Sequence, residues 1–249
     1  MGHKMKLWLR SLMFNLAFYC GSTAMCFLLL WSLLLPYRAL LSVVHLWLRQ
    51  IAWMERDIAG ITYQVIGREN IPAGACIIAA KHQSAWETMK LFLLFDNPAI
   101  VLKKELLNVP LWGQYLRRSG AIPIDRTAGR KALIGMMEAA HKAVEQGRKV
   151  IIFPQGTRLP PDADRPYKSG VAALYHDLNV PVVPMALNSG LFWPKGSFIK
   201  HPGKVTIEFL PPIPAGLSRE AMMTQLRDRL ETATKRLVAE ARQKQALLP

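Results

Sequence analysis

The chain has 249 residues, enough for one large α/β domain or two small ones, and about half of its side chains are apolar. Its 32 Lys and Arg residues outnumber its 17 Asp and Glu residues, which gives a formal charge of +15. Such a surplus implies an acidic partner, such as nucleic acid, anionic lipid or a phosphorylated substrate, or else a basic solvated surface. The three cysteines fit no CxxC or metal-ligand spacing, and no GxGxxG motif or P-loop is present, so the sequence provides no metal site and no nucleotide-binding loop of those kinds.

A long uncharged segment follows the basic N-terminus. Residues 11–37 contain no Asp, Glu, Lys or Arg. As a helix rising about 1.5 Å per residue, this run is long enough to cross a hydrocarbon core of about 30 Å. It is longer than the apolar region of a signal peptide and no convincing cleavage site follows it, so we expect it to remain on the protein and to bind a membrane.

The next segment, ALLSVVHLWLRQIAWM at 39–54, is amphipathic and shorter than a full span. Trp47, Arg49 and Trp53 suit a helix that lies at a membrane surface. Both flanks of the uncharged run are basic, so the positive-inside rule favours neither orientation of a single crossing. Two arrangements stay open: a re-entrant or in-plane helix pair with both basic ends in the cytoplasm, and a single span before a soluble domain. We assign 1–57 as a membrane-binding helical segment.

Beyond residue 57, strand and helix patterns alternate. Apolar runs between turn residues predict strands at 61–67, 75–80, 99–104, 120–125, 149–153, 180–187 and 204–209. Helical periodicity predicts helices at 84–95, 128–146, 169–177 and 218–243. The alternation predicts an α/β fold, with a mixed, mostly parallel sheet flanked by helices. Because no linker is evident, 58–249 is predicted to be one catalytic domain with a C-terminal helix.

A histidine and an acid follow the second predicted strand, in AAKHQSAWETMKLF at 79–92. His82 lies in the turn and Glu87 in the first turn of the next helix, so Glu87 can orient a histidine that takes a proton from a hydroxyl or amine. Ser84-Ala-Trp-Glu87 is also a capping box, in which Glu87 binds the Ser84 N–H. Both interpretations of Glu87 stay open. Ser84 has no G-x-S-x-G elbow around it and is better explained as a cap than as a nucleophile.

Basic residues follow several of the predicted strands. GAIPIDR places Arg126 after one strand, FPQGTR places Gly156 and Arg158 after another, and RPYKSG places Lys168 before a helix. Ligand sites collect at strand ends in α/β sheets, and arginine suits bidentate contact with phosphate. Each residue alone is more often a surface charge, but several cations at successive strand ends favour a phosphate site beside the histidine.

Four segments, taken in order, resemble the sequence blocks of the glycerolipid acyltransferases, in particular the bacterial 1-acyl-glycerol-3-phosphate acyltransferases. KHQSAWE resembles the first block, H-x4-D, and VLKKELLNVPLWGQYLRRSGAIPIDR resembles the second. IIFPQGTR resembles the third, F-P-E-G-T-R, and VPVVPMAL the fourth. The resemblance covers about 60–215, and the apolar N-terminal helices resemble the membrane-embedded motif of this family.

The resemblance implies a role for each matching residue. His82 is the implied general base, and Glu87 stands in place of the usual Asp, one methylene longer. Gln155 replaces a glutamate, which keeps an acceptor oxygen for glycerol hydroxyls but loses a charge. The implied substrate ligands are Arg126 and Arg158 for phosphate, Lys103 and Lys168 as secondary candidates, Gln155, and Gly156, which lets the backbone approach the substrate.

The implied reaction moves a fatty acyl group from acyl-CoA or acyl-carrier protein to the sn-2 hydroxyl of lysophosphatidic acid, giving phosphatidic acid, without a metal or another cofactor. Backbone N–H groups near the His82 turn, helped by a cation, are expected to stabilise the oxyanion. No acyl-enzyme is needed, because no activated Ser or Cys is evident. The resemblance also implies a place at a bacterial inner membrane, with the catalytic domain facing the cytoplasm.

Other functions stay open. They are an acyltransferase for another lysolipid, such as a lyso-ornithine lipid or a different lysophospholipid, a hydrolase in which water replaces the acceptor, and a non-catalytic protein bound to anionic membranes. A nucleic-acid partner is not expected, because the aromatic residues lie mostly in the apolar N-terminus rather than among basic residues, where they would stack on bases.

Overall fold

The computed structural model describes residues 2–125 and 127–246, and its centre is a seven-stranded sheet. In spatial order the strands are β1 (Ile61–Ile66), β7 (Gly203–Phe209), β6 (Val182–Leu187), β2 (Ile77–Ala80), β5 (Val150–Ile152), β3 (Ala99–Lys103) and β4 (Ile122–Ile124). Neighbouring strands are parallel except β6 and β7, which pair antiparallel. The predicted mixed, mostly parallel sheet is confirmed.

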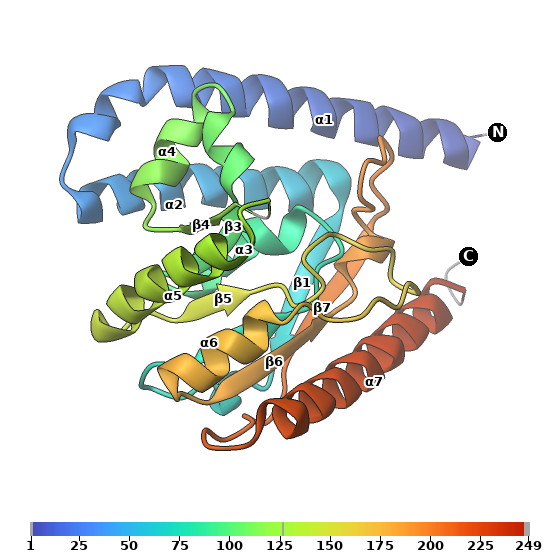
Figure 1. Cartoon of the computed structure of the whole chain (residues 1–249). Coiled ribbons are helices and arrows are strands. Elements are labelled where there is room, and N and C mark those ends of the chain that lie inside the picture. Colours follow the sequence, from blue (N-terminus) through green and yellow to red (C-terminus); the bar gives the residue numbers. More distant parts are fainter. Residues whose placement is uncertain (1, 126, 247–249) are drawn as a thin grey trace.

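Helices cover both faces of this sheet (Figure 1). One face packs against α1 (Gly2–Leu28), α2 (Tyr37–Met54) and α3 (Trp86–Leu94), and the other against α5 (Gly129–Glu145), α6 (Gly170–Leu178) and α7 (Arg219–Ala246). Short helical turns complete the chain: η1 (Leu30–Leu34), η2 (Glu55–Ala59), η3 (Arg68–Asn70), η4 (Lys104–Asn108) and η5 (Ser189–Leu191).

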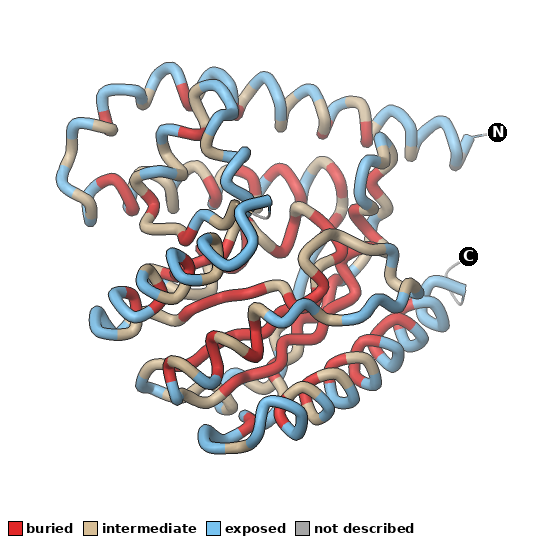
Figure 2. Tube along the Cα trace, viewed as in Figure 1, coloured by how far each residue is buried: buried red, intermediate tan, exposed pale blue. Residues whose placement is uncertain are grey.

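Each face of the sheet has its own hydrophobic core, and the central strands are buried on both faces (Figure 2). All four residues of β2 and all six of β6 are buried. Strands of this kind read as unbroken apolar runs in the sequence, since neither face meets water. This explains why both strands could be predicted to within two residues of their ends.

One helix was not predicted. The α4 helix (Trp112–Arg118) follows Pro110 and Leu111, and Leu111 has a φ of +63°, in the left-handed region. A helix of two turns is too short for a clear apolar period, and its start depends on a backbone conformation that leucine seldom adopts. The Tyr115 hydroxyl of α4 donates to the Cys26 carbonyl of α1, so tertiary contact holds this helix in place.

The N-terminal helices lie against the rest of the protein. The α1 helix contains a stretch, Lys4–Leu28, that is long and apolar enough to cross a membrane by length and composition. It nevertheless packs along α2 and the rest of the protein (Figure 1). Phe14 is fully buried, and the Arg10 side chain donates to the Ile58 carbonyl. The division into 1–57 and 58–249 stays a prediction, although Phe14, Leu48 and sheet residues share one core.

Candidate active site

The loop after β2 holds the histidine that was predicted as the base. Because β2 and β5 are parallel neighbours, the segments that follow them leave the same edge of the sheet. The His82 ring stacks on the Phe153 ring with centroids 3.9 Å apart. Its Nδ1 atom lies 2.9 Å from Glu87 Oε1, whereas Nε2 has no hydrogen-bond partner among the described residues. The side chain is 16% exposed, so Nε2 is the nitrogen available to a substrate.

Glu87 is both a histidine partner and a helix cap. Its carboxylate is fully buried, and Oε1 accepts the Gln83 and Ser84 N–H groups at 2.7 Å each, in addition to facing His82. Its Oε2 accepts the Ser189 hydroxyl at 2.7 Å. The two interpretations that the sequence left open are therefore both realised, since one oxygen serves both contacts. A carboxylate in this position orients the imidazole and can support an imidazolium.

Three N–H groups of the turn are already occupied and are not available to an oxyanion. His82 N–H donates to Gln155 Oε1 at 3.1 Å, and the next two N–H groups, of Gln83 and Ser84, donate to Glu87. The expectation that this turn supplies the oxyanion donors is therefore wrong for these three groups. The physical reason is the capping box itself, which consumes the free N–H groups of the helix start. Ser84 is equally committed, because its buried hydroxyl accepts the Trp86 N–H at 3.1 Å.

The loop after β5 holds His82 from a second side. Gln155 is 1% exposed, and its side-chain oxygen is occupied by the His82 N–H. The Leu159 N–H donates to the His82 carbonyl at 2.9 Å. Gly156 has a φ of +69°, a conformation that favours glycine, and a Cβ there would lie 3.3 Å from Lys168 Cγ. Gln155 thus supports the histidine backbone, while its contact with glycerol hydroxyls stays a prediction.

The predicted cations do not all meet at His82. Arg158 is partly buried in the loop after β5, and Lys168 is exposed beside Gly156. Lys103 ends β3, which β5 separates from β2, and its ammonium lies 2.9 Å from the Glu105 carboxylate. Arg126 lies outside the described residues. The structure therefore brings Glu87 of α3 close to the loops that hold His82, Gln155, Gly156, Arg158 and Lys168, and leaves Lys103 paired at a strand further along the sheet.

Helix α7 braces this site through a side chain that the sequence did not reveal. Glu231 accepts the fully buried Lys81 ammonium at 2.5 and 2.6 Å and the Tyr167 hydroxyl at 2.7 Å. Burial and the Glu231 charge raise the pKa of Tyr167, so the phenol stays protonated and donates. Lys81 directly precedes His82, and Tyr167 directly precedes Lys168. One carboxylate therefore ties two site loops to the same helix.

Asn188 gives α7 a third connection to the site. Its side-chain N–H₂ donates to the Leu237 carbonyl at 3.1 Å, and its side-chain oxygen accepts the Thr206 N–H at 2.8 Å. Asn188 directly precedes Ser189, whose hydroxyl binds Glu87. No local pattern could reveal these contacts, because each partner lies far away in the sequence.

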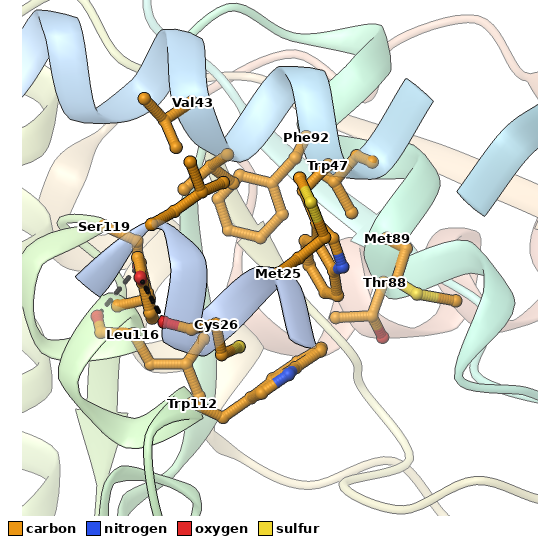
Figure 3. A pocket seen from close by; sticks show the side chains of 14 residues that line it. Met25, Cys26, Val43, Trp47, Thr88, Met89, Phe92, Trp112, Leu116 and Ser119 are labelled. Carbon is orange, nitrogen blue, oxygen red and sulfur yellow. Dashed lines mark hydrogen bonds between the residues drawn. The ribbon is translucent and has the colours of Figure 1, made fainter. Parts of the chain in front are cut away.

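An apolar cavity adjoins the first turns of α3 (Figure 3). Its volume is about 100 Å³, and Thr88 and Met89, which directly follow Glu87, form part of its wall. The remaining lining residues come from α1, the turn after it, α2, α3 and α4: Met25, Cys26, Leu29, Val43, Val44, Trp47, Leu48, Phe92, Trp112, Tyr115, Leu116 and Ser119. A space with walls of this kind accepts a hydrocarbon chain and excludes charged groups.

Comparison with known proteins agrees with this geometry. Residues 62–188 match the model of a protein family described as Acyltransferase. The chain is 38% identical over 208 residues to a 1-acyl-sn-glycerol-3-phosphate acyltransferase of Pseudomonas aeruginosa, covering 83% of this chain and 81% of that protein. It is 32% identical over 194 residues to the enzyme of the same name from Limnanthes douglasii, covering 77% of this chain and 69% of that protein.

A solved structure shares the fold. The crystal structure of the 1-acyl-sn-glycerophosphate acyltransferase from Thermotoga maritima superimposes with a TM-score of 0.73 at 21% sequence identity, and covers 92% of this chain and 97% of that one. At this identity the likeness concerns the fold, which is the same arrangement of sheet and helices.

Proposed function

The chain belongs to the acyltransferase family, and we propose that it is a 1-acyl-sn-glycerol-3-phosphate acyltransferase that moves a fatty acyl group to the sn-2 hydroxyl of lysophosphatidic acid, giving phosphatidic acid. The observation that carries this proposal is the His82–Glu87 pair at the carboxyl end of a central parallel strand, with one imidazole nitrogen held and the other available. A hydroxyl needs such a base to become a nucleophile at neutral pH.

The reaction proceeds by direct transfer. The sn-2 hydroxyl gives its proton to His82 Nε2, and its oxygen forms a bond with the thioester carbonyl carbon of acyl-CoA or acyl-carrier protein. The tetrahedral intermediate collapses, the carbon–sulfur bond breaks, and the thiolate takes the proton back from His82. Glu87 holds the Nδ1–H tautomer and stabilises the imidazolium between these steps. Because the N–H groups of His82, Gln83 and Ser84 are occupied, a nearby cation stabilises the oxyanion.

The apolar cavity is suited to the acyl chain. It adjoins the residues that follow Glu87, and its walls are almost wholly apolar (Figure 3). Burial of a methylene contributes about 0.8 kcal/mol, so a cavity of fixed depth favours a chain that fills it. The site needs no metal or other cofactor for this chemistry, because the base and the activated thioester supply all the steps.

The N-terminal helices suit an enzyme whose acceptor and product are lipids. Exposed apolar side chains follow α1 and the turn after it, where no core covers them: Met5, Trp8, Leu9, Met13, Leu16, Tyr19, Phe27, Leu28, Leu30, Trp31 and Leu34. Since α1 is bound along the domain, we infer that it holds the domain at the membrane as a re-entrant or in-plane pair with α2. The membrane is a bacterial inner membrane, with the catalytic domain on its cytoplasmic side, where the thioester donors occur.

The decisive experiment incubates purified protein with lysophosphatidic acid and labelled acyl-CoA or acyl-carrier protein. Wild type forms phosphatidic acid, and His82→Ala loses at least about 10²-fold in kcat, because the hydroxyl no longer has a base. His141→Ala is the matched control, since His141 forms an exposed pair with Asp177 at 2.7 Å outside the site. Wild-type rates from His82→Ala would end the proposal. If product forms only with a lyso-ornithine lipid or another lysophospholipid, that lipid is the acceptor. Thioester hydrolysis without acceptor would indicate a hydrolase.

A further inference from the structure

A second cleft borders the active-site turn. It has a volume of about 580 Å³ and lies between residues 12–20 of α1 and the segment 193–200. Ala85, which lies between His82 and Glu87 in the sequence, forms part of its wall, as does Arg158. Because the Leu159 N–H binds the His82 carbonyl, the loop that carries Arg158 runs directly beside the base. The cleft therefore adjoins the reacting group without being the apolar cavity.

The two walls of this cleft are tied together. Asn15 on α1 donates to the Phe198 carbonyl at 2.8 Å, and the Ser11 hydroxyl accepts the Lys200 N–H at 3.0 Å. The Lys200 ammonium is used within its own segment, where it donates to the Ser197 and Phe198 carbonyls at 2.6 and 3.1 Å. Lys200 consequently stabilises the 193–200 segment, and its ammonium is not available to a ligand.

Two other cations face the cleft with no acidic partner. Arg158 and Lys195 both line it, and within the described part of the chain neither forms an ion pair. The Lys195 ammonium donates to the Arg158 carbonyl at 3.3 Å, which brings the two residues together. Two neighbouring unpaired cations beside a base suit a phosphate group.

The opposite wall is apolar and opens toward the surface of α1. Leu12, Leu16, Phe18 and Tyr19 line it, and Leu16 and Tyr19 are 55% and 66% exposed. Leu16 and Tyr19 belong to the exposed apolar strip of α1 that we place at the membrane. A ligand that satisfies both walls has one anionic head and one hydrocarbon chain, and it enters from the lipid surface.

We propose that this cleft binds the acceptor lysophospholipid, with its phosphate between Arg158 and Lys195 and its chain along Leu16 and Tyr19 of α1. The proposal rests on the proposed function and adds Lys195 to its phosphate ligands. It also separates the two hydrocarbon chains: the acyl group of the donor occupies the apolar cavity, and the acceptor chain occupies the cleft. Both spaces border α1 and the start of α3, at Met25 and Thr88 for the cavity and at Leu16 and Ala85 for the cleft.

The test compares Lys195→Gln with Lys204→Gln, an exposed lysine on β7 outside the cleft. KM is measured separately for lysophosphatidic acid and for acyl-CoA in mixed micelles. Loss of one charged contact to phosphate raises KM for lysophosphatidic acid about tenfold in Lys195→Gln and leaves kcat and KM for acyl-CoA unchanged. Lys204→Gln keeps both wild-type KM values. A rise in KM for acyl-CoA alone would place the donor phosphates in the cleft and overturn the proposal, as would no change in either KM.

A second pair of variants tests the apolar wall. Leu16→Asn raises KM for lysophosphatidic acid several-fold, whereas Leu28→Asn, at a 69% exposed position on the same helix outside the cleft, does not. Both leucines are largely exposed, so neither change threatens the fold. Equal effects of both variants would indicate general membrane binding and refute the acceptor site. If wild type makes no phosphatidic acid, the proposed function fails first, and the occupant assigned to the cleft fails with it.

Discussion

Replacing Glu87 with glutamine separates the catalytic part of this carboxylate from its capping part. An amide oxygen at the Oε1 position still accepts the Gln83 and Ser84 N–H groups and faces His82, and its N–H₂ group then faces the Ser189 hydroxyl, which can turn to accept. Geometry is kept and charge is lost. The imidazolium that forms during transfer loses its counter-charge, so kcat is expected to fall by about 10²–10⁴-fold.

The stability cost follows from the same contacts. Charged acceptors contribute about 1.5–3 kcal/mol per hydrogen bond and neutral ones about 0.5–1.5, so Glu87→Gln is expected to cost about 1–2 kcal/mol after relaxation. Glu87→Ala leaves the Gln83 and Ser84 N–H groups without an acceptor in a buried site, at about 1–3 kcal/mol each. With about 2–4 °C per kcal/mol for a chain of this size, the melting temperature falls by about 2–8 °C for glutamine and further for alanine.

The assay pairs kcat at saturating substrates with thermal melting of the same preparations. The expected pattern is a large loss of kcat with a small loss of melting temperature in Glu87→Gln, and large losses of both in Glu87→Ala. Wild-type kcat in Glu87→Gln would reduce Glu87 to a helix cap. An unchanged melting temperature in Glu87→Ala would refute the capping contacts.

Three further predictions concern other parts of the molecule. Glu231→Leu strands the fully buried Lys81 ammonium and costs about 3–5 kcal/mol in unfolding free energy, most of which the added Lys81→Met change restores; additive losses in thermal melting would contradict this coupling. Val43→Trp fills the apolar cavity and shifts the preference toward shorter acyl donors in a competition assay, and an unchanged preference would place the acyl chain elsewhere. Burial raises the pKa of Cys76 to about 11, so at pH 8 the fast reaction with a thiol reagent comes from the exposed Cys20 and is absent in Cys20→Ser. A fast phase that persists in Cys20→Ser would contradict this by showing another accessible thiol.

Much of the fold and part of the site could be predicted from local patterns. The strands appear as apolar runs because the central ones are buried on both faces, and the His82–Glu87 contact could be anticipated because both residues belong to one strand–turn–helix segment. The capping box is equally local, since its donors and acceptor lie within four residues. What the pattern could not decide was whether Glu87 caps the helix or orients the histidine, and the structure shows one oxygen doing both.

The rest depended on contacts between residues far apart in the chain. Ser189 contacts Glu87 across 102 residues and Glu231 contacts Lys81 across 150. Only the packing of α7 on β6 and the pairing of β6 with β2 bring them together. The antiparallel pairing of β6 with β7, the short α4 helix, the apolar cavity and the cleft also depend on such distant contacts. Hydrophobic burial produces a periodic pattern in a sequence, and helix capping produces a short local motif. The sequence by itself therefore determined most helices and strands and the His82–Glu87 pair. The long-range contacts that support this pair, and the cavity and cleft for its substrates, produce no such pattern. They exist only where separate helices and strands pack together.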